Sequence, residues 1–488
     1  MKIEISAEKI YKEYEKAVGY NTLSDYYFKT KQQENFYLGN QWVGINAPNL
    51  DKPVLNFIRR VCAFLTAMVA SDDMAIYISP YIHTKENSKC ADMLNMEIEK
   101  IAESCKLKSL SRQAVQDSVV KGDGFIYWYY AKGTVNAQLL QAKNILFANP
   151  YNPDVQQQPY ILIEKMEYLE NVLEQAGQNG GQKDKISQDK QGDSLYQCAP
   201  MVKTITKMYK QDGQVWYTKI TKDGVVVRAK NLHYTLYPLA KISWDRQSES
   251  YHGMGAVENL VPNQIAVNKL WAMALLHQRT MAFPKIFFDR TKIESWTNKV
   301  GAAIGVMGNP NDIVASSFKA NDMSVQVMEV VEKTISFTKE FMGANDTSLG
   351  NIAPQNTSAI IAVQRSATIP LQNQKQAYEQ FLEDCVLIIL DIISKDYGEK
   401  LVEILDEKGE YSLERYDFSA VEYDQMEWSV QAENSSVWSE SIQAQTLENL
   451  YAKQIITDAY DYVQAIPASQ LKNKQQLLKK LKEKQQAE

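Results

Sequence analysis

Histidine is scarce in this sequence, with four among 488 residues, and the usual catalytic motifs are missing as well. His83, His233, His252 and His277 form no HExxH motif, and no two of them are four residues apart, so nothing indicates a metal site. Neither a GxSxG motif nor a GxxxxGK motif followed by Ser or Thr occurs. The glycines of GAAIGVMGNP (301–310) are therefore interpreted as turn residues. We expect no enzymatic activity, no catalytic residue, no cofactor and no bound metal.

Disulfides and membrane segments are not indicated either. The five cysteines are odd in number and contain no CxxC pair, which is typical of a reducing compartment such as the cytoplasm. The apolar run VLIIL (386–390) stops at Asp391 and is far too short to span a bilayer. The first residues, MKIEISAEKIYKEYEK, lack the apolar region of a secretory signal. We therefore expect a protein that is made or assembled inside a cell and has no membrane partner.

A basic charge over the whole chain is also lacking, because the formal net charge is −6 and the pI is about 5.6. The basic signal is local: residues 471–488 contain six lysines and two glutamates, a net charge of 6 − 2 = +4. Two interpretations remain open. The segment is either an inward-facing tail that touches DNA or a partner, or a solvated terminal helix that frays. The candidate contact residues of the first interpretation are Lys472, Lys474, Lys479, Lys480 and Lys482.

Enough apolar residues are present for a folded core, at 45% of the chain, and their spacing predicts a mainly helical α+β protein. Helices are predicted at 6–38, 54–71, 86–121, 255–282, 331–343, 357–396 and 437–488. Strands are predicted at 75–80, 125–130, 203–209, 215–221, 225–230 and 285–289, with further candidates at 301–308, 324–330 and within 410–430. The polar stretch 173–195 is predicted to be a mobile surface loop. Pro370 should kink or restart the helix around it.

Four stretches, in this order along the chain, together resemble bacteriophage portal proteins. They are NFYLGNQW (35–42) with PVLNFIRRVCAFLTAMV (53–69), the segment from YHGMGAVENL to PKIFFD (251–289), GANDTSLGNIAPQNTSAIIAVQRSA (343–367) and SESIQAQTLENLYAKQIITDAY (439–460). No single stretch is a catalytic signature, so the signal lies in their order and spacing.

The resemblance implies a portal fold with wing, stem, clip and crown regions and a long kinked helix after a tunnel loop. The expected layout is an N-terminal wing (1–250) that includes loop 173–195 and the β-meander 203–230, a stem helix region (251–289), wing strands and a helix (290–342), a tunnel loop (343–359), a long kinked helix with a following wing segment (360–430), and a helical crown with the basic tail (431–488).

The function that the resemblance implies is a homo-oligomeric ring at one capsid vertex. Such rings have about twelve subunits, and twelve copies would form a closed ring through heterologous contacts. Double-stranded DNA passes through the channel without sequence-specific contacts. The implied partners are the large terminase subunit, head-tail adaptor proteins, and the major capsid or scaffolding protein. The implied location is the virion, after assembly in the host cytoplasm.

The loop 343–359 provides the candidate channel residues Asn345, Asp346, Thr347, Ser348 and Asn351. It contains no Lys or Arg. Each Lys–phosphate contact would add affinity for the DNA backbone and impede sliding, so this composition suits a channel lining. In the helix 255–282, Trp271, Leu275 and Met281 could pack against a neighbouring copy, although packing within the subunit is an equal alternative.

Two other function classes remain. One is a cytoplasmic metal-dependent enzyme that processes nucleic acid, such as a nuclease with carboxylate-bound magnesium, which would need acidic residues converging in space. The other is a general interaction scaffold, which would be a monomer or dimer rather than a large ring.

Overall fold

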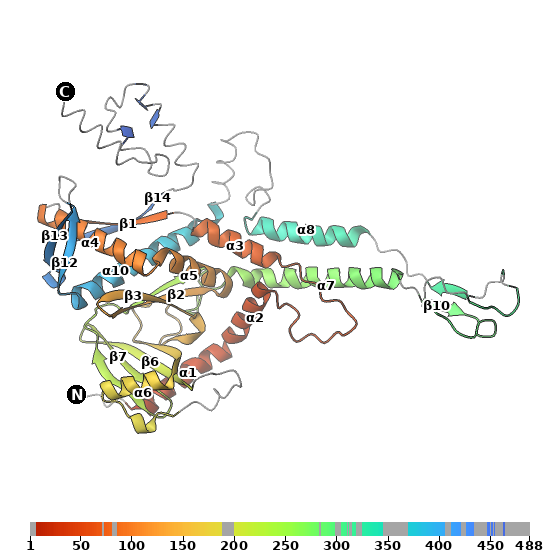
Figure 1. Ribbon diagram of the computed structural model, residues 1–488, viewed down its shortest axis with the longest axis horizontal. Coiled ribbons are helices and arrows are strands. Elements are labelled where there is room, and N and C mark those ends of the chain that lie inside the picture. The colour runs from red at the N-terminus through yellow and green to blue at the C-terminus, as the bar shows by residue number, and fades with distance from the viewer. Residues whose placement is uncertain are drawn as a thin grey trace.

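The computed structural model describes residues 6–70, 73–80, 85–187, 200–282, 285–297, 304–309, 311, 315–318, 325–344, 369–405, 411–420 and 426–433, together with 447–448, 450–451, 453 and 462–463. These residues form a mixed α and β body from which a long arm projects (Figure 1). The mainly helical α+β class predicted from the sequence is confirmed. Among the helices of the described residues, none has both the length and the apolar character needed to cross a membrane.

The N-terminal part contains five helices: α1 (Ala7–Leu23), α2 (Tyr26–Leu38), α3 (Phe57–Val69), α4 (Lys85–Ser104) and α5 (Leu107–Lys121). The prediction of single helices over 6–38 and 86–121 was wrong, because each is broken once. Asp25 and Lys106 adopt left-handed φ angles of 56° and 53°, which a continuing α-helix does not allow. The apolar spacing runs on across both breaks, so periodicity alone does not reveal them.

A three-stranded antiparallel sheet lies at the centre of the body, with β2 (Asp123–Ala131) between β3 (Thr134–Leu140) and β9 (Leu239–Ser243). Phe125 and Ile126 point to opposite faces of β2, and both are fully buried. Both faces of the sheet are therefore covered, and helices α5 and α10 (Gln372–Asp396) contact it. One buried cluster joins these elements to α3 and α4.

A second, five-stranded sheet follows the order β4 (Ile145–Phe147), β5 (Tyr160–Tyr168), β6 (Met201–Gln211), β7 (Gln214–Ile220) and β8 (Val225–Asn231). All neighbouring strands in it are antiparallel, so the predicted meander 203–230 is confirmed. Val225 packs in a cluster with α1, whereas its neighbour Val226 packs in a cluster with α6 (Leu169–Gln178). Because successive strand residues point to opposite faces, α1 and α6 cover the two faces of this sheet.

Helix α6 corrects the prediction of a loop over 173–195, since residues 173–178 are helical. Val172 and Ala176 lie one turn apart and are buried against the sheet, and Leu169 and Leu173 pack against the same cluster. These four apolar side chains at helical spacing dock the short helix, although the composition of the whole stretch is that of a loop. Residues 183–185 form a 3₁₀ turn, and 188–199 lie outside the described residues.

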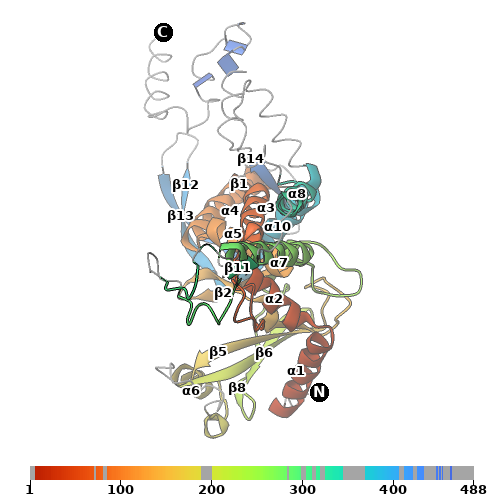
Figure 2. The same cartoon turned by 90° about the vertical axis from the view of Figure 1, so that its right-hand side faces the viewer.

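The arm consists of α7 (Ala256–Ala282), the strand pair β10 (Lys285–Phe288) and β11 (Ala315–Phe318), and α8 (Val325–Phe341). Helices α7 and α8 lie side by side in both views, and the strand pair lies beyond the outer end of α7 (Figures 1 and 2). Residues 324–330 were predicted as a strand, but 325–330 begin α8. Residues 304–308 were also predicted as part of a strand and belong to none. The geometry thus groups β11 and α8 with α7, although the layout predicted from the resemblance assigned 290–342 to the wing.

The chain then returns to the body through α10, which follows a 3₁₀ turn at Ile369–Leu371 that contains Pro370. The helix therefore starts after Pro370 within the described residues, and 357–368 lie outside them. Strand β1 (Asp73–Pro80) pairs with β14 (Met426–Glu433), and β12 (Glu399–Leu405) pairs with β13 (Tyr411–Asp417). Most of the predicted helical region 437–488 also lies outside the described residues.

Candidate assembly arm and the buried junction at its base

Helix α7 changes its surroundings about halfway along its length. Its first half is buried in the body, with Val257, Leu260 and Val267 almost inaccessible to solvent. Beyond Ala274 no residue of the helix is buried, and Met273 is 60% exposed. The first half is therefore the anchor of the arm, and the second half projects from the body (Figure 1).

Helix α8 presents one apolar face to α7 and a second one to solvent. Thr338 is buried and accepts a hydrogen bond from Asn263 Nδ2 of α7 at 3.0 Å. On the solvent side Val330, Phe337 and Phe341 form a stripe at spacings of seven and four residues, and Phe341 is 88% exposed. Exposed apolar side chains aligned along one side of a helix are typical of a contact with another protein. We call these three residues the arm stripe.

The predicted interface residues of α7 are not the most exposed apolar residues of that helix. Trp271, Leu275 and Met281 are all half-buried in the single chain, whereas Met273 and Leu276 are exposed. The prediction that they contact a neighbouring copy stays a prediction. The periodicity of the helix could not separate the face turned to α8 from the face turned to solvent.

The loop between α2 and α3, residues 39–56, is fastened to α7 by polar contacts. Asn268 Nδ2 donates to Gln41 Oε1 at 2.6 Å, and Gln264 Nε2 donates to the carbonyl oxygen of Leu55 at 2.9 Å. Both donors are buried, and they lie more than 200 residues from their partners. This loop joins the two parts of the first stretch that resembles portal proteins (35–42 and 53–69), and Gln41 and Leu55 belong to those parts. The stretch therefore contacts the anchoring half of the arm.

At the base of the arm three glycines let two backbone segments approach closely. A Cβ atom on Gly122, whose φ is +100°, would lie 2.1 Å from the carbonyl oxygen of Gly253. A Cβ atom on Gly255 would lie 2.8 Å from the carbonyl oxygen of Val120. The end of α5 is thereby packed directly against the segment that leads into α7. The sequence predicted Gly122 as the helix break, and α5 does end at Lys121.

Asp123 follows this glycine and is the centre of a buried polar junction. Its carboxylate accepts hydrogen bonds from Ser243 Oγ at 2.7 Å, from His252 Nδ1 at 3.0 Å and from the Gly253 amide at 3.0 Å. Lys241 Nζ lies 3.5 Å from Asp123 Oδ1 and also donates to the carbonyl oxygen of Tyr251. Strands β2 and β9 and the segment before α7 are thus joined through one carboxylate.

The charges of this junction follow from burial and pairing together. Burial alone would raise the pKa of Asp123, but the Lys241 ammonium and the hydrogen bond from His252 outweigh it and lower the pKa to about 2. Burial lowers the pKa of His252 despite the neighbouring carboxylate. Asp123 is therefore ionised, and His252 is neutral with its proton on Nδ1.

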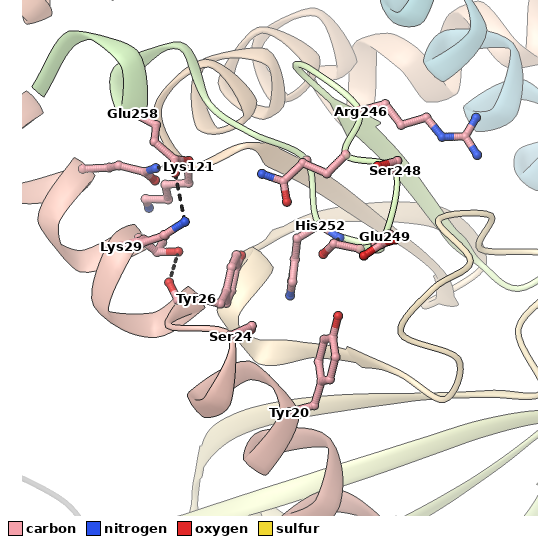
Figure 3. A pocket seen from close by; sticks show the side chains of 15 residues that line it. Tyr20, Ser24, Tyr26, Lys29, Lys121, Arg246, Ser248, Glu249, His252 and Glu258 are labelled. Atoms are coloured by element: carbon pink, nitrogen blue, oxygen red, sulfur yellow. Dashed lines mark hydrogen bonds and ion pairs between the residues drawn. The ribbon is translucent and has the colours of Figure 1, made fainter.

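A pocket of about 570 Å³ opens beside His252 (Figure 3). Its walls come from the corner between α1 and α2, the end of α5, the loop 246–253 and the first turn of α7. The Tyr26 ring stacks on the His252 ring at a centroid distance of 3.5 Å. Lys29 Nζ pairs with Glu258 Oε1 at 3.1 Å across the pocket wall, and Lys121 Nζ pairs with Glu34 Oε1 at 3.2 Å. The sequence pattern gave no signal of this pocket, because the α1–α2 corner and the loop 246–253 are more than 200 residues apart in the sequence.

The described residues contain no group of three or more His, Cys, Asp or Glu side chains that could hold a metal ion. Cys62 and Cys385 are buried in apolar surroundings, as expected for packing residues. Burial raises the pKa of the Cys62 thiol to about 12, so it is not an activated nucleophile.

The predicted channel residues Asn345, Asp346, Thr347, Ser348 and Asn351 and the predicted tail lysines Lys472, Lys474, Lys479, Lys480 and Lys482 lie outside the described residues. Of the predicted loop 343–359, the structure describes Gly343 and Ala344, and Ala344 is fully buried. The described chain resumes at Ile369. In α10, Gln374 Nε2 donates to Asp245 Oδ1 at 2.9 Å, and Asp245 is bridged to Met254 next to α7. Helix α10 is thus tied to the base of the arm.

A family model described as "Phage P22-like portal protein" matches residues 154–487, which is more than half of the chain. The chain belongs to this portal protein family. The match covers the whole arm, α10 and strands β5 to β8 of the second sheet, and it confirms the portal resemblance inferred from the sequence. No curated protein matches the portal chain significantly. Residues 6–153 of this portal protein, including the loop 39–56 and Asp123, lie before the matched region.

Proposed function

We propose that this portal protein is one subunit of a closed ring through which double-stranded DNA enters and leaves a capsid. The observation that carries the proposal is the two-helix arm, which projects from the body with an apolar stripe exposed along α8. An exposed apolar surface does not stabilise a single chain in water. In a ring, one side of each arm meets a different side of its neighbour's arm, and the stripe is buried repeatedly.

The arm supplies the stem and the clip of the ring in this proposal. Helices α7 and α8 form the stem, and the strand pair β10–β11 with the exposed Phe287 forms the clip. The clip is the docking site for the large terminase subunit and, later, for head-tail adaptor proteins. The body and the segments after it face the major capsid or scaffolding protein. About twelve copies complete the ring, as inferred from the portal resemblance and from closed heterologous symmetry.

The channel lining is assigned to the loop that joins the stem to α10. Its candidate residues are Asn345, Asp346, Thr347, Ser348 and Asn351. The absence of Lys and Arg from 343–359 supports this assignment, because DNA that must slide should not bind the wall tightly. The burial of Ala344 at the start of this loop and the hydrogen bond from Gln374 of α10 to Asp245 suit a connection that has to withstand moving DNA.

The remaining parts of the proposal concern chemistry and location. The ring is structural and leaves ATP hydrolysis to the terminase motor, because the sequence lacks a phosphate-binding motif. It resides at one vertex of the virion after assembly in the host cytoplasm. Lys472, Lys474, Lys479, Lys480 and Lys482 contact DNA or a partner from the basic tail, which carries a local charge of +4.

Negative-stain electron microscopy of the purified full chain tests the central claim. We expect rings with a central hole wide enough for a DNA duplex, and a matching mass by native mass spectrometry. A protein that remains a monomer or dimer under all assembly conditions, including the presence of scaffolding protein, would contradict the ring. A magnesium-dependent nuclease activity of the chain would instead favour the alternative of a nucleic-acid enzyme.

Replacing Asp346 with Lys should hinder DNA movement without preventing ring assembly. Each subunit would place a cation in the channel, and every new Lys–phosphate contact adds salt-dependent affinity. We expect packaging into procapsids to fall about tenfold at low salt and to recover partly at high salt. The measurement is nuclease-protected DNA per procapsid, with ring formation checked by microscopy.

The control for this experiment is Asp346→Asn, which removes the acidic charge but adds no cation. It should package DNA nearly as well as the unchanged chain. A map of the ring with residue 346 on the exterior, or equal packaging by the Lys and Asn variants at low salt, would refute the channel assignment.

A further inference from the structure

Gln33, in the wall of the pocket beside His252, has a side-chain oxygen that accepts no hydrogen bond within the described residues. Gln33 is only 4% exposed, and its Nε2 donates to Glu258 Oε2 at 3.3 Å. A carboxylate can only accept, so the amide orientation is fixed and Oε1 faces elsewhere. Within the described residues, Gln33 Oε1 is buried and has no hydrogen-bond partner. Because buried polar atoms are nearly always paired, this atom indicates that a donor is missing.

His252 provides a second unused acceptor at the same pocket. Its Nδ1 donates to Asp123, so the ring nitrogen on the other side, Nε2, has a free lone pair. Nε2 is buried and has no hydrogen-bond partner among the described residues. His252 is itself 4% exposed and held by stacking on Tyr26, so it cannot turn to find water elsewhere.

Two of the cationic side chains that line the pocket are paired with carboxylates. Lys29 is neutralised by Glu258, and Lys121 is neutralised by Glu34 and Asp117. Glu249 lines the pocket next to His252 and makes no ion pair within the described residues. The side chain of Arg246 is directed away from His252 (Figure 3).

The geometry points to a binding site for an ammonium or guanidinium group in this pocket. Such a group offers several donors, which two orphaned acceptors and one carboxylate require, and it carries the opposite charge to Glu249. The half-buried ring of Tyr20 also lines the pocket, and aromatic faces attract cations. The volume of about 570 Å³ suits a side chain or a small amine. This site goes beyond the proposed channel function.

Two sources can supply this chemistry: an arginine or lysine side chain of a second copy of the chain, and a free polyamine. Two probes represent them, N-acetyl-arginine amide and putrescine. The full-length protein is first separated by size into single chains and rings. Each probe is then titrated into each fraction, and binding is measured by calorimetry. We expect saturable binding to the single chain.

The variant Glu249→Gln should weaken binding at least tenfold, which corresponds to about 1.4 kcal/mol. Glu249 is exposed, so its replacement should not disturb folding. Gln33→Met is a second variant that removes the buried acceptor at similar volume and should weaken binding as well. The matched control is Glu103→Gln, which alters an exposed glutamate on α4 outside the pocket and should bind both probes as the unchanged chain does.

Binding of the probes to the assembled rings distinguishes the two sources. If rings bind putrescine as the single chain does, the pocket is open and its occupant is a free amine. If only the single chain binds, a neighbouring copy already fills the pocket in the ring. No saturable binding of either probe to the single chain, or equal weakening by Glu249→Gln and Glu103→Gln, would overturn the site and leave a water-filled pocket. Rings that form normally in that case leave the proposed channel function untouched.

Discussion

A chain with both Phe337 and Phe341 replaced by aspartate should remain a single chain and form no rings. In the proposed arrangement each phenylalanine of the arm stripe is covered by a neighbouring arm. Burying a phenylalanine side chain contributes about 1.5–3 kcal/mol, and an aspartate at the same place would bury an unpaired charge. Because every contact in a closed ring is equivalent, the loss is repeated at each one. Sedimentation and negative-stain microscopy at matched concentration measure the outcome.

The control for this double variant is Tyr168→Asp on the second sheet. Tyr168 and Phe337 are both 54% exposed in the single chain, so this control introduces the same charge at an aromatic residue as exposed as Phe337. Tyr168 is at the end of β5, away from the arm (Figure 2), and its variant should still form rings. Both variants should unfold at nearly the temperature of the unchanged chain, because the replaced side chains contact mainly solvent. Rings formed by the double variant would show that the arm stripe does not lie between copies.

Sequence periodicity predicted the elements that run without a break between clear turn signals. Helix α7 and the meander β6–β8 are examples, and their residues agree with the predicted ranges. It did not find the breaks at Asp25 and Lys106, because a left-handed residue leaves the apolar spacing intact. It also assigned a strand to 324–330, where Val325, Val327 and Val330 favour β-structure locally. Packing against α7 overrides that preference, since α8 has a partner helix along its length.

The candidate site was likewise predictable from the sequence only in part. The end of α5 at Lys121 agrees with the predicted helix, which also ends at residue 121. The close approach of Gly122 to Gly253, however, joins two segments that are more than 100 residues apart in the sequence. The contact between Asn268 and Gln41 spans 227 positions and has no local signal. The order of four weak stretches nevertheless predicted the family, because an ordered set of segments reflects the whole chain rather than any one contact.

Asp123 should be the residue of the body whose replacement costs most stability. Asp123→Asn keeps the side-chain volume but leaves the Lys241 ammonium buried without its counter-charge. Breaking a buried ion pair in this way costs about 3–5 kcal/mol. Denaturant unfolding of the single chain at pH 7 should show this loss through a lower midpoint at unchanged slope.

The pH dependence of this effect has a definite sign. The folded pKa of Asp123 is lowered to about 2 from a usual value of 3.8, so the folded state favours the ionised carboxylate. Its contribution to stability is complete above pH 3.8 and is lost as the pH falls through about 2. The difference between Asp123→Asn and the unchanged chain should therefore be constant from pH 5 to pH 7 and shrink below pH 4, by an amount on the order of 2 kcal/mol.

The double variant Asp123→Asn with Lys241→Met separates the ion pair from the hydrogen bonds of the same carboxylate. Methionine fills the space of the lysine stem without a charge, so the uncompensated ammonium disappears. If the ion pair dominates, the double variant should recover about half or more of the lost stability, because the cost lies in the unpaired charge. If the double variant is as unstable as Asp123→Asn alone, the hydrogen bonds from Ser243, His252 and the Gly253 amide hold the base of the arm instead. The pH dependence would then follow the loss of those bonds.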